Sequence, residues 1–351
     1  MSIELIISLV KANIVLAVLL TNTILLIWFE RKVVAGMQSR VGPDRAGPFG
    51  ILQTLADAIK LLLKEQILPS KADRAMYLLA PLIALVPSFL IFMIIPLGPD
   101  ITVEWQNALY TIPLVGADLN VGVLYFLALS SIAVYSVVLA GWSSGSKYPL
   151  LGGVRASAQM ISYEAAMGLA LVPVILYSGS LSLVDIVNSQ SGNLSSSIPI
   201  LNTIVSFIPK WNIFPQFVAF GIFFIAAVAE VNRAPFDLVE AEQELVGGFH
   251  TEYSGFRFAM FFLAEYINMF NMCAITATFF LGGWLGPTFE GILPPIFSVI
   301  MPIIWLGVKT FLLLFVFVWI RATLPRLRYD KVMELGWKIM IPLSLVWLVL
   351  S

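Results

Sequence analysis

The sequence has very few residues of the kinds that bind redox metals. It contains one cysteine, Cys273, and one histidine, His250, among 351 residues. An iron–sulfur cluster needs about four cysteine thiolates, and a pair of haems needs about four histidine ligands. We therefore expect the chain to carry no redox centre and no metal of its own.

Charge is also scarce. Only 12% of the residues are charged, and the formal net charge is −1. A nucleic-acid-binding domain or a polybasic lipid anchor would be strongly basic, so we expect no nucleic-acid partner.

Apolar residues, in contrast, make up 59% of the chain, and the mean hydropathy is +0.93. A water-soluble domain cannot bury that much apolar surface, so the bilayer must solvate it. The composition predicts an all-α polytopic membrane protein that forms a single transmembrane helical domain over residues 1–351.

Windows of about 19 residues indicate eight membrane spans. The first leads straight into Glu30 without a small-residue cleavage site, so we expect a span and not a cleavable signal peptide. The eight spans are Leu5–Phe29, Met76–Leu97, Leu119–Gly141, Ala156–Tyr177, Phe217–Val231, Phe258–Gly283, Phe297–Ile320 and Trp337–Leu350.

Lysine and arginine are distributed unevenly between the connections. The first, third, fifth and seventh connections hold 17 of the 20. The positive-inside rule places these connections inside and both termini outside. The inner connections cover about 30–75, 142–155, 232–257 and 321–336, and their length suggests that function resides on this face.

The first inner connection contains an amphipathic stretch. Gln53, Asp57, Lys60 and Lys64 form one polar stripe if residues 50–64 are helical, and leucine and isoleucine cover the rest. Such a helix lies in the membrane interface. It could simply anchor the fold, or it could form a lip over an opening through which an amphiphile enters from the bilayer.

Three acids and one lysine stand out at or within predicted spans, where charge is costly and usually functional. They are Glu164, Glu230, Glu265 and Lys309. Three acids cannot all be neutralised by one lysine, so we expect groups able to hold and release protons along a proton path. Pairing with nearby lysine or arginine is the structural alternative.

Carboxylates gather in the fifth connection, where five acids face two bases. Asp237, Glu240 and Glu244 share one face if this part is helical, and Glu242 lies off it. Composition alone favours a solvated acidic loop, and no ordered metal-ligand spacing is present. In the seventh connection, Arg321 stands where the span ends. Ordinary positive flanking of a span explains most of the basic residues there, and Arg321 could also orient an anionic or quinone-like headgroup or a loop carboxylate.

Long motifs occupy all four inner connections. The motifs are ERKVVAGMQSRVGPDRAGPFGILQTLADAIKLLLKE, GWSSGSKYPLLGGVRASAQMISYE, AEVNRAPFDLVEAEQELVGGFHTEYSGFRFAMFFLAEY and WIRATLPRLRYDKVMELGWK. On these motifs the chain resembles a membrane-subunit family of respiratory complex I, the proton-pumping NADH–quinone oxidoreductase; this is the H-type subunit of bacteria, known as subunit 1 in mitochondria. Small departures from the family pattern occur at Asp44, Thr54, Gly145 and Lys331.

The resemblance implies roles for individual residues. Glu30 and Arg31, and less directly Arg45, Asp57 and Arg321, correspond to residues of the family's quinone chamber. Asp237, Glu240, Glu242 and Glu244 lie in its acidic coupling loop, and Glu164, Glu230 and Glu265 match carboxylates of its proton channel, to which we add Lys309. No residue is expected to be catalytic on this chain alone.

The resemblance also implies partners. These are the soluble quinone-site subunit, the subunit with the terminal iron–sulfur cluster, small membrane subunits and antiporter-like subunits. Quinone is the expected substrate, and iron–sulfur clusters and FMN belong to partner subunits only. The expected location is a prokaryotic plasma membrane or an organellar inner membrane.

Two other classes remain open from the sequence. One is the equivalent subunit of a ferredoxin- or deazaflavin-linked dehydrogenase or of an energy-converting hydrogenase. The other is a stand-alone secondary transporter, which would also need intramembrane acids but would not need long inner connections suited to soluble partners.

Overall fold

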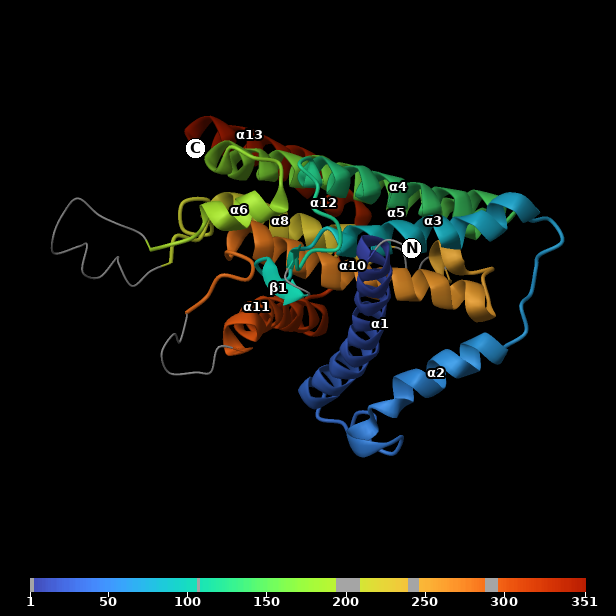
Figure 1. The fold of residues 1–351 in the computed structure, drawn as a ribbon. Coiled ribbons are helices and arrows are strands. Elements are labelled where there is room, and N and C mark those ends of the chain that lie inside the picture. The colour runs from blue at the N-terminus through green and yellow to red at the C-terminus, as the bar shows by residue number, and fades with distance from the viewer. Residues whose placement is uncertain (1–2, 106–107, 194–208, 239–245, 288–295) are drawn as a thin grey trace.

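A computed structural model describes residues 3–105, 108–193, 209–238, 246–287 and 296–351. Regular structure in these residues is helical, together with one antiparallel hairpin of β1 (Ile101–Trp105) and β2 (Ala108–Ile112) (Figure 1). The all-α membrane-protein prediction is therefore confirmed. The helices are α1 (Ile3–Met37), η1 (Pro48–Gly50), α2 (Leu52–Leu63), α3 (Arg74–Met93), α4 (Gly122–Ser143), α5 (Lys147–Ser178), α6 (Leu183–Ser189), α8 (Phe217–Glu230), η2 (Gly248–His250), α10 (Gly255–Phe280), α11 (Ile296–Thr323), α12 (Tyr329–Glu334), η3 (Leu335–Met340) and α13 (Ile341–Leu350).

Helices occur at all eight predicted span positions. Seven of them, among the residues described, are long and apolar enough to cross a membrane, with α12, η3 and α13 forming one continuous span. The fifth, α8, has only 14 residues, which is about 21 Å of helix against a hydrocarbon core of about 30 Å. A total of eight full spans stays a prediction.

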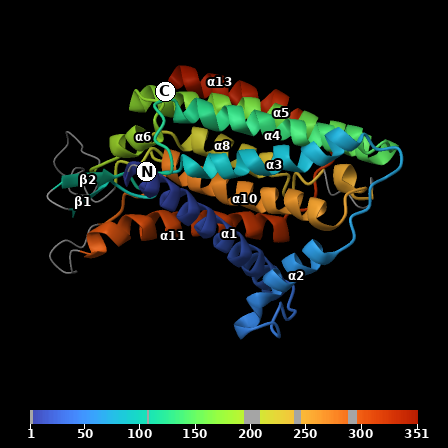
Figure 2. The same cartoon turned by 45° about the vertical axis from the view of Figure 1, so that its right-hand side comes forward.

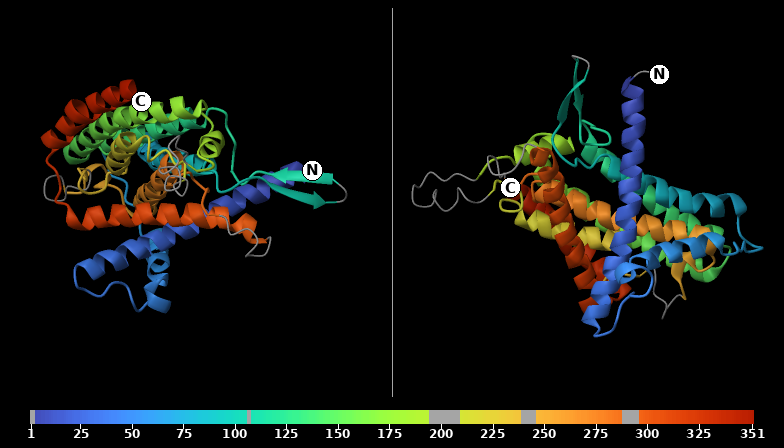
Figure 3. Two further views of the ribbon diagram at one scale, coloured as in Figure 1. Left: turned by 90° about the vertical axis from the view of Figure 1, so that its left-hand side faces the viewer. Right: turned by 60° about the horizontal axis from the view of Figure 1, so that its bottom comes forward.

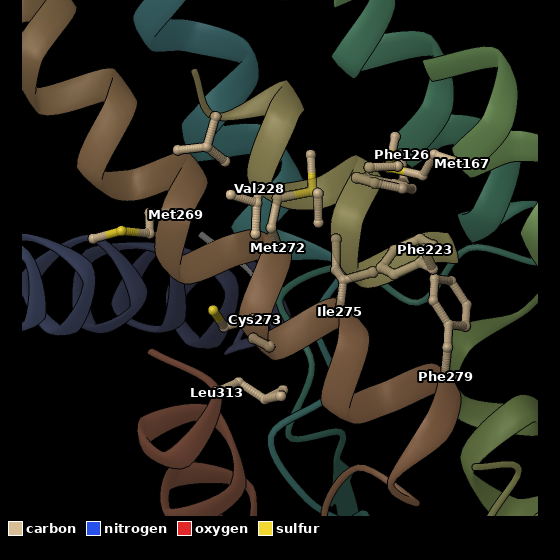
Figure 4. Close-up of a cluster of buried hydrophobic side chains, with 14 of the residues drawn as sticks. Phe126, Met167, Phe223, Val228, Met269, Met272, Cys273, Ile275, Phe279 and Leu313 are labelled. Carbon is tan, nitrogen blue, oxygen red and sulfur yellow. The ribbon is translucent and has the colours of Figure 1, made fainter. Parts of the chain in front are cut away.

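The C-terminal end of the short α8, residues 226–230, is buried in protein. Ala219, Ala226, Ala227 and Ala229 are fully buried, and these small side chains let neighbouring helices approach closely. Figure 4 shows Phe223 and Val228 of α8 facing α10, with Phe126, Met167 and Phe279 close by. Because protein surrounds this end, the short helix can stop at depth without exposing backbone groups to lipid.

The four connections predicted to be inner lie together at one end of the bundle. Each of these connections follows an odd-numbered span and precedes an even-numbered one. Their grouping at one end therefore agrees with the predicted up-and-down order of the spans. The contacts are Asp73 N to Ser143 O (2.9 Å), the stacked rings of Tyr77 and Tyr253 (centroids 4.1 Å apart) and Leu327 N to Pro235 O (2.9 Å).

The remaining connections meet at the opposite end, beside the hairpin and α6 (Figure 2). Val123 N donates to Leu181 O at 3.0 Å, and Gly282 N donates to the side chain of Gln190 at 3.0 Å. Which end faces the cell interior stays a prediction from the positive charges.

Helices α1 and α2 stand apart from the rest of the bundle. In Figure 3, α1 crosses the other helices obliquely, and α2 lies beyond its C-terminal end. The α2 helix begins two residues later and ends one residue earlier than the predicted 50–64. Leu52, Ile59 and Leu62 on this helix are 50%, 48% and 56% exposed, as expected for a helix at an apolar boundary.

Helix α5 contacts η2 so closely that only glycine fits. A methyl group added at Gly152 would lie 2.7 Å from the Cα of Gly248, whereas one added at Gly168, on the same helix, meets nothing nearer than Leu127 Cδ1 at 4.0 Å. We expect Gly152→Ala to lower the free energy of unfolding by about 1–3 kcal/mol through overpacking. Gly168→Ala should be neutral or slightly stabilising. Thermal unfolding of the two purified variants measures the difference, and equal midpoints would contradict the packing.

Candidate functional site

A buried acid, a partly buried acid and two arginines form an ionic cluster where α1, α8, α10 and α11 meet. Glu30, near the end of α1, is 3% exposed and forms an ion pair with Arg321 of α11. Arg233, just after α8, lies between two carboxylates: its Nη1 is 3.6 Å from Glu30 Oε1, and its Nε is 2.8 Å from Glu265 Oε1. One guanidinium therefore links an acid of α1 to an acid of α10.

Local structure fixes the position of Arg233. Asn232 takes a left-handed backbone conformation (φ 53°), which asparagine tolerates better than most residues. Gln159 of α5 stabilises this turn by donating to Ala229 O at 2.9 Å and to Phe236 O at 2.8 Å. The Arg233 guanidinium also lies 4.4 Å from the centre of the Tyr266 ring, an additional favourable contact for a buried cation.

Two adjacent serines of α4 bind the other two acids. Ser130 Oγ donates to Glu230 Oε1 at 2.8 Å, and Ser131 Oγ donates to Glu164. Glu230 is buried at the end of α8, and Glu164 is half-buried on α5. Two consecutive residues of α4 thus donate hydrogen bonds to two different predicted channel carboxylates.

A cavity of about 80 Å³ connects two of the acids. Its polar lining includes Glu230, Glu265, His250, Asn232 and Asn268, and its apolar lining includes three phenylalanines of α10. A space of this size has room for several water molecules, and water needs polar partners such as these. The cavity therefore has room for water between Glu230 and Glu265 inside an apolar bundle.

His250 lies on the wall of this cavity. Its ring packs edge-on against Phe249 (centroids 5.0 Å apart) and Phe258 (5.4 Å). Burial lowers the pKa of His250 to about 4, although the carboxylate of Asp237 acts in the opposite direction. The imidazole is therefore neutral at pH 7.

The acidic segment is described only in part. Asp237 pairs with Arg326 at 2.9 Å, which joins the fifth connection to the seventh. Glu240, Glu242 and Glu244 lie outside the described residues, so their predicted coupling role stays a prediction.

Two predicted chamber residues, Arg31 of α1 and Asp57 of α2, form an ion pair between the two helices. Arg31 lies 2.5 Å from Asp57, and Gln53 also donates to Asp57 at 2.9 Å. Burial raises the pKa of Asp57, but the hydrogen bonds from Arg31 and Gln53 outweigh it and leave the pKa below its usual value. Arg45 is exposed on the loop before η1, away from the buried cluster.

Lys309 lies apart from the carboxylates. Its ammonium group donates to the carbonyl oxygens of Leu281 (2.6 Å), Gly283 (2.9 Å) and Leu285, and it lies 4.3 Å from the Trp211 ring. Leu281 follows Glu265 by 16 residues, or about 24 Å of helix. Lys309 thus satisfies orphan carbonyls at the end of α10, and its predicted place in a proton channel has no support from this position.

Sequence reasoning missed the bridging role of Arg233, which it treated as one of the inner positive charges. Its position three residues after Glu230 was the available signal. His250 and the serines of α4 were also missed, because no periodicity reveals which neighbouring helix a single polar residue faces. Among the described residues, no three histidine, cysteine, aspartate or glutamate side chains gather as a metal site would require.

Comparison with known proteins gives a consistent match along the chain. The family model described as NADH dehydrogenase matches residues 10–351. An H-type subunit of the NADH-quinone oxidoreductase of Syntrophobacter fumaroxidans is 51% identical over 336 residues, covering 96% of this chain and 92% of the relative. The H-type subunits of Frankia casuarinae (52% identity; 97% and 70% covered) and Ralstonia pickettii (49%; 97% and 90%) are similarly related.

Removing the bridging cation should be costly. We expect Arg233→Gln to lower the free energy of unfolding by about 3–5 kcal/mol, because it leaves Glu30 and Glu265 without their shared partner in a buried site. Arg328→Gln is the matched control, since Arg328 is 82% exposed in its pair with Asp330 and such pairs contribute about 0–1 kcal/mol. Thermal unfolding measures both, and a neutral Arg233→Gln would show that the cluster contributes little.

His250 predicts a specific pH dependence. A folded-state pKa of about 4 lies below the usual value of about 6.5, so the stabilisation is complete above pH 6.5. It falls as the pH drops towards 4, because the unfolded chain binds the proton first. At about 1.4 kcal/mol per pH unit, the loss is about 3 kcal/mol. The unfolding midpoint of the wild type relative to His250→Gln should follow this curve between pH 7 and 4, and parallel curves would contradict it.

Proposed function

Because the chain belongs to the NADH dehydrogenase family, as the H-type membrane component of NADH–quinone oxidoreductase, we propose that it forms part of the quinone chamber and couples quinone reduction to proton translocation. It is a multi-pass membrane subunit of an oxidoreductase complex, so other subunits of that complex are its partners.

The proposed partners supply the electron chemistry. Soluble subunits carry FMN and the iron–sulfur clusters, the terminal cluster faces the quinone, and antiporter-like subunits continue the proton path. The named relatives come from bacteria, which favours a bacterial plasma membrane as the location. The long connections gathered at one end of the bundle provide a surface for the soluble subunits.

The observation that carries the proposal is the continuous series of ionisable groups from α1 to the cavity. Glu30 pairs with Arg321 and shares Arg233 with Glu265. Glu265 lines the same cavity as Glu230, and Glu230 and Glu164 bind adjacent serines. Ion pairs, one shared cavity and two adjacent serines thus support a path from a predicted chamber residue to the predicted channel carboxylates.

Sharing one cation between two acids provides a physical means of coupling. Reduction of a quinone takes up protons and changes the charge beside Glu30 and Arg321. If Glu30 becomes neutral, Arg233 interacts more strongly with Glu265 and stabilises its anion. If Glu30 is charged, the two acids compete for the same guanidinium, so the groups titrate as a coupled set.

Helices α1 and α2 are proposed to frame the entrance from the bilayer. The Arg31–Asp57 pair holds the two helices together, and Trp28 Nε1 donates to Phe49 O at 2.9 Å. Their apolar side chains face outwards, which suits the passage of a lipid-soluble molecule. Arg45, on the loop between these helices, can meet a headgroup or a soluble subunit.

We expect Glu230→Gln and Glu265→Gln each to lower proton pumping by about 100-fold, because a positioned proton-transfer group contributes about that much. Glu334→Gln is the matched control, since Glu334 only forms exposed pairs with Lys331 and Lys338. Proton uptake by reconstituted complexes is measured alongside quinone reduction. Full pumping in both channel variants would overturn the proposed path.

The assembly itself tests the wider proposal. Purification of this chain under mild conditions should recover iron–sulfur and antiporter-like subunits, and the complex should reduce quinone in an inhibitor-sensitive reaction. A chain that purifies alone and transports a solute would instead be a secondary transporter.

A further inference from the structure

The cavity has one polar wall whose purpose the path from Glu30 to Glu230 does not explain. His250, the only histidine of the chain, lines the cavity together with Glu230 and Glu265. It belongs to η2, not to a membrane-spanning helix, and so comes from the inner end of the bundle. Neither quinone binding nor the Arg233 bridge requires an imidazole at this position.

Asp237 lies in the same connection as His250, and its carboxylate acts to raise the pKa of the imidazole. Asp237 is itself partly exposed and pairs with Arg326, whose side chain is 34% exposed. The connection that carries His250 therefore also carries a charged group that reaches solvent. These groups are separate from the Arg233 bridge.

The groups around the imidazole favour proton transfer over ion pairing. The charged groups that face it are Asp237 on its own connection and Glu230 and Glu265 across the cavity, whereas α4 and α5 contribute Ser136, Val137 and Met160 to the lining. A neutral imidazole can accept a proton on one nitrogen and donate from the other. Its pKa of about 4 keeps it in that neutral, bifunctional form at pH 7.

We propose that His250 relays protons between Asp237 and the cavity that holds Glu230 and Glu265, which gives the proton path a second entrance at the inner end of the bundle. This inference rests on the proposed function, because it assigns the source of protons to the same carboxylates. It adds a residue that exchanges protons without touching the quinone.

The transfer balances within the residues named. A proton from solvent passes by way of the Asp237 carboxylate to the bare nitrogen of the ring, and the proton on the other nitrogen leaves, through water in the cavity, to Glu265 or Glu230. The imidazole is neutral before and after, Asp237 is again a carboxylate paired with Arg326, and a half-turn of the ring restores the starting tautomer. No oxidant, reductant or metal is needed.

The competing explanation is that His250 is only a packing residue between Phe249 and Phe258. His250→Phe separates the two, because it keeps an aromatic ring at the contact but has no nitrogen. His250→Ala opens space in the cavity wall, into which free imidazole can bind. Phe258→Ala removes a neighbouring ring of the same contact and serves as the matched control.

The experiment uses the whole complex reconstituted in proteoliposomes. We expect His250→Phe and His250→Ala to lower proton pumping by about 100-fold, the typical effect of losing a positioned proton-transfer group. Added imidazole should restore pumping in His250→Ala and not in Phe258→Ala. In the His250→Phe background, Asp237→Asn should cause little further loss, because both residues act in one series.

Each outcome has one meaning. Full pumping in His250→Phe, or rescue of Phe258→Ala as well as His250→Ala, would overturn the relay. Failure of the proposed function is distinguishable, because then the wild-type complex itself would not pump or Glu230→Gln would pump normally. Subunit recovery and thermal midpoint identify a variant that does not assemble, and imidazole rescue of an assembled His250→Ala complex then decides.

Discussion

The arrangement of this protein depends on one buried guanidinium that serves two carboxylates. Arg233 lies within 3.6 Å of Glu30 and 2.8 Å of Glu265, in an environment where an unpaired charge would cost several kcal/mol. It pairs with both acids, and α1, the end of α8 and α10 meet at its position. The site and the fold therefore share the same stabilising contact.

The short α8 makes this contact possible. A full-length span would carry the chain past the bundle interior, whereas α8 ends at Glu230 and turns at Asn232 while still enclosed by protein. Glu230 and Arg233 are only three residues apart, but the turn directs them to different places. Glu230 lines the cavity, and Arg233 belongs to the ionic cluster. Buried alanines along α8 allow the close packing that shields both groups from lipid.

The polar groups inside the bundle are positioned by hydrogen bonds from uncharged side chains. Serines of α4 donate to Glu230 and Glu164, and Gln159 of α5 fixes the turn before Arg233. Hydroxyl and amide donors stabilise a carboxylate without neutralising it, so the acids can still exchange protons. Lys309 has the opposite environment, because three carbonyl oxygens hold its charge in one place.

The sequence by itself determined the fold class, the positions of the membrane helices, the interfacial α2 and the set of unusual intramembrane charges. Hydropathy and charge placement are properties of single segments, so they can be read without knowing which segments touch. Only the tertiary structure decided that Arg233 bridges Glu30 and Glu265, that His250 opens onto the cavity and that Lys309 lies far from the acids. Those facts depend on the rotation of each helix about its axis and on which helices become neighbours, because packing between segments distant in the chain fixes both.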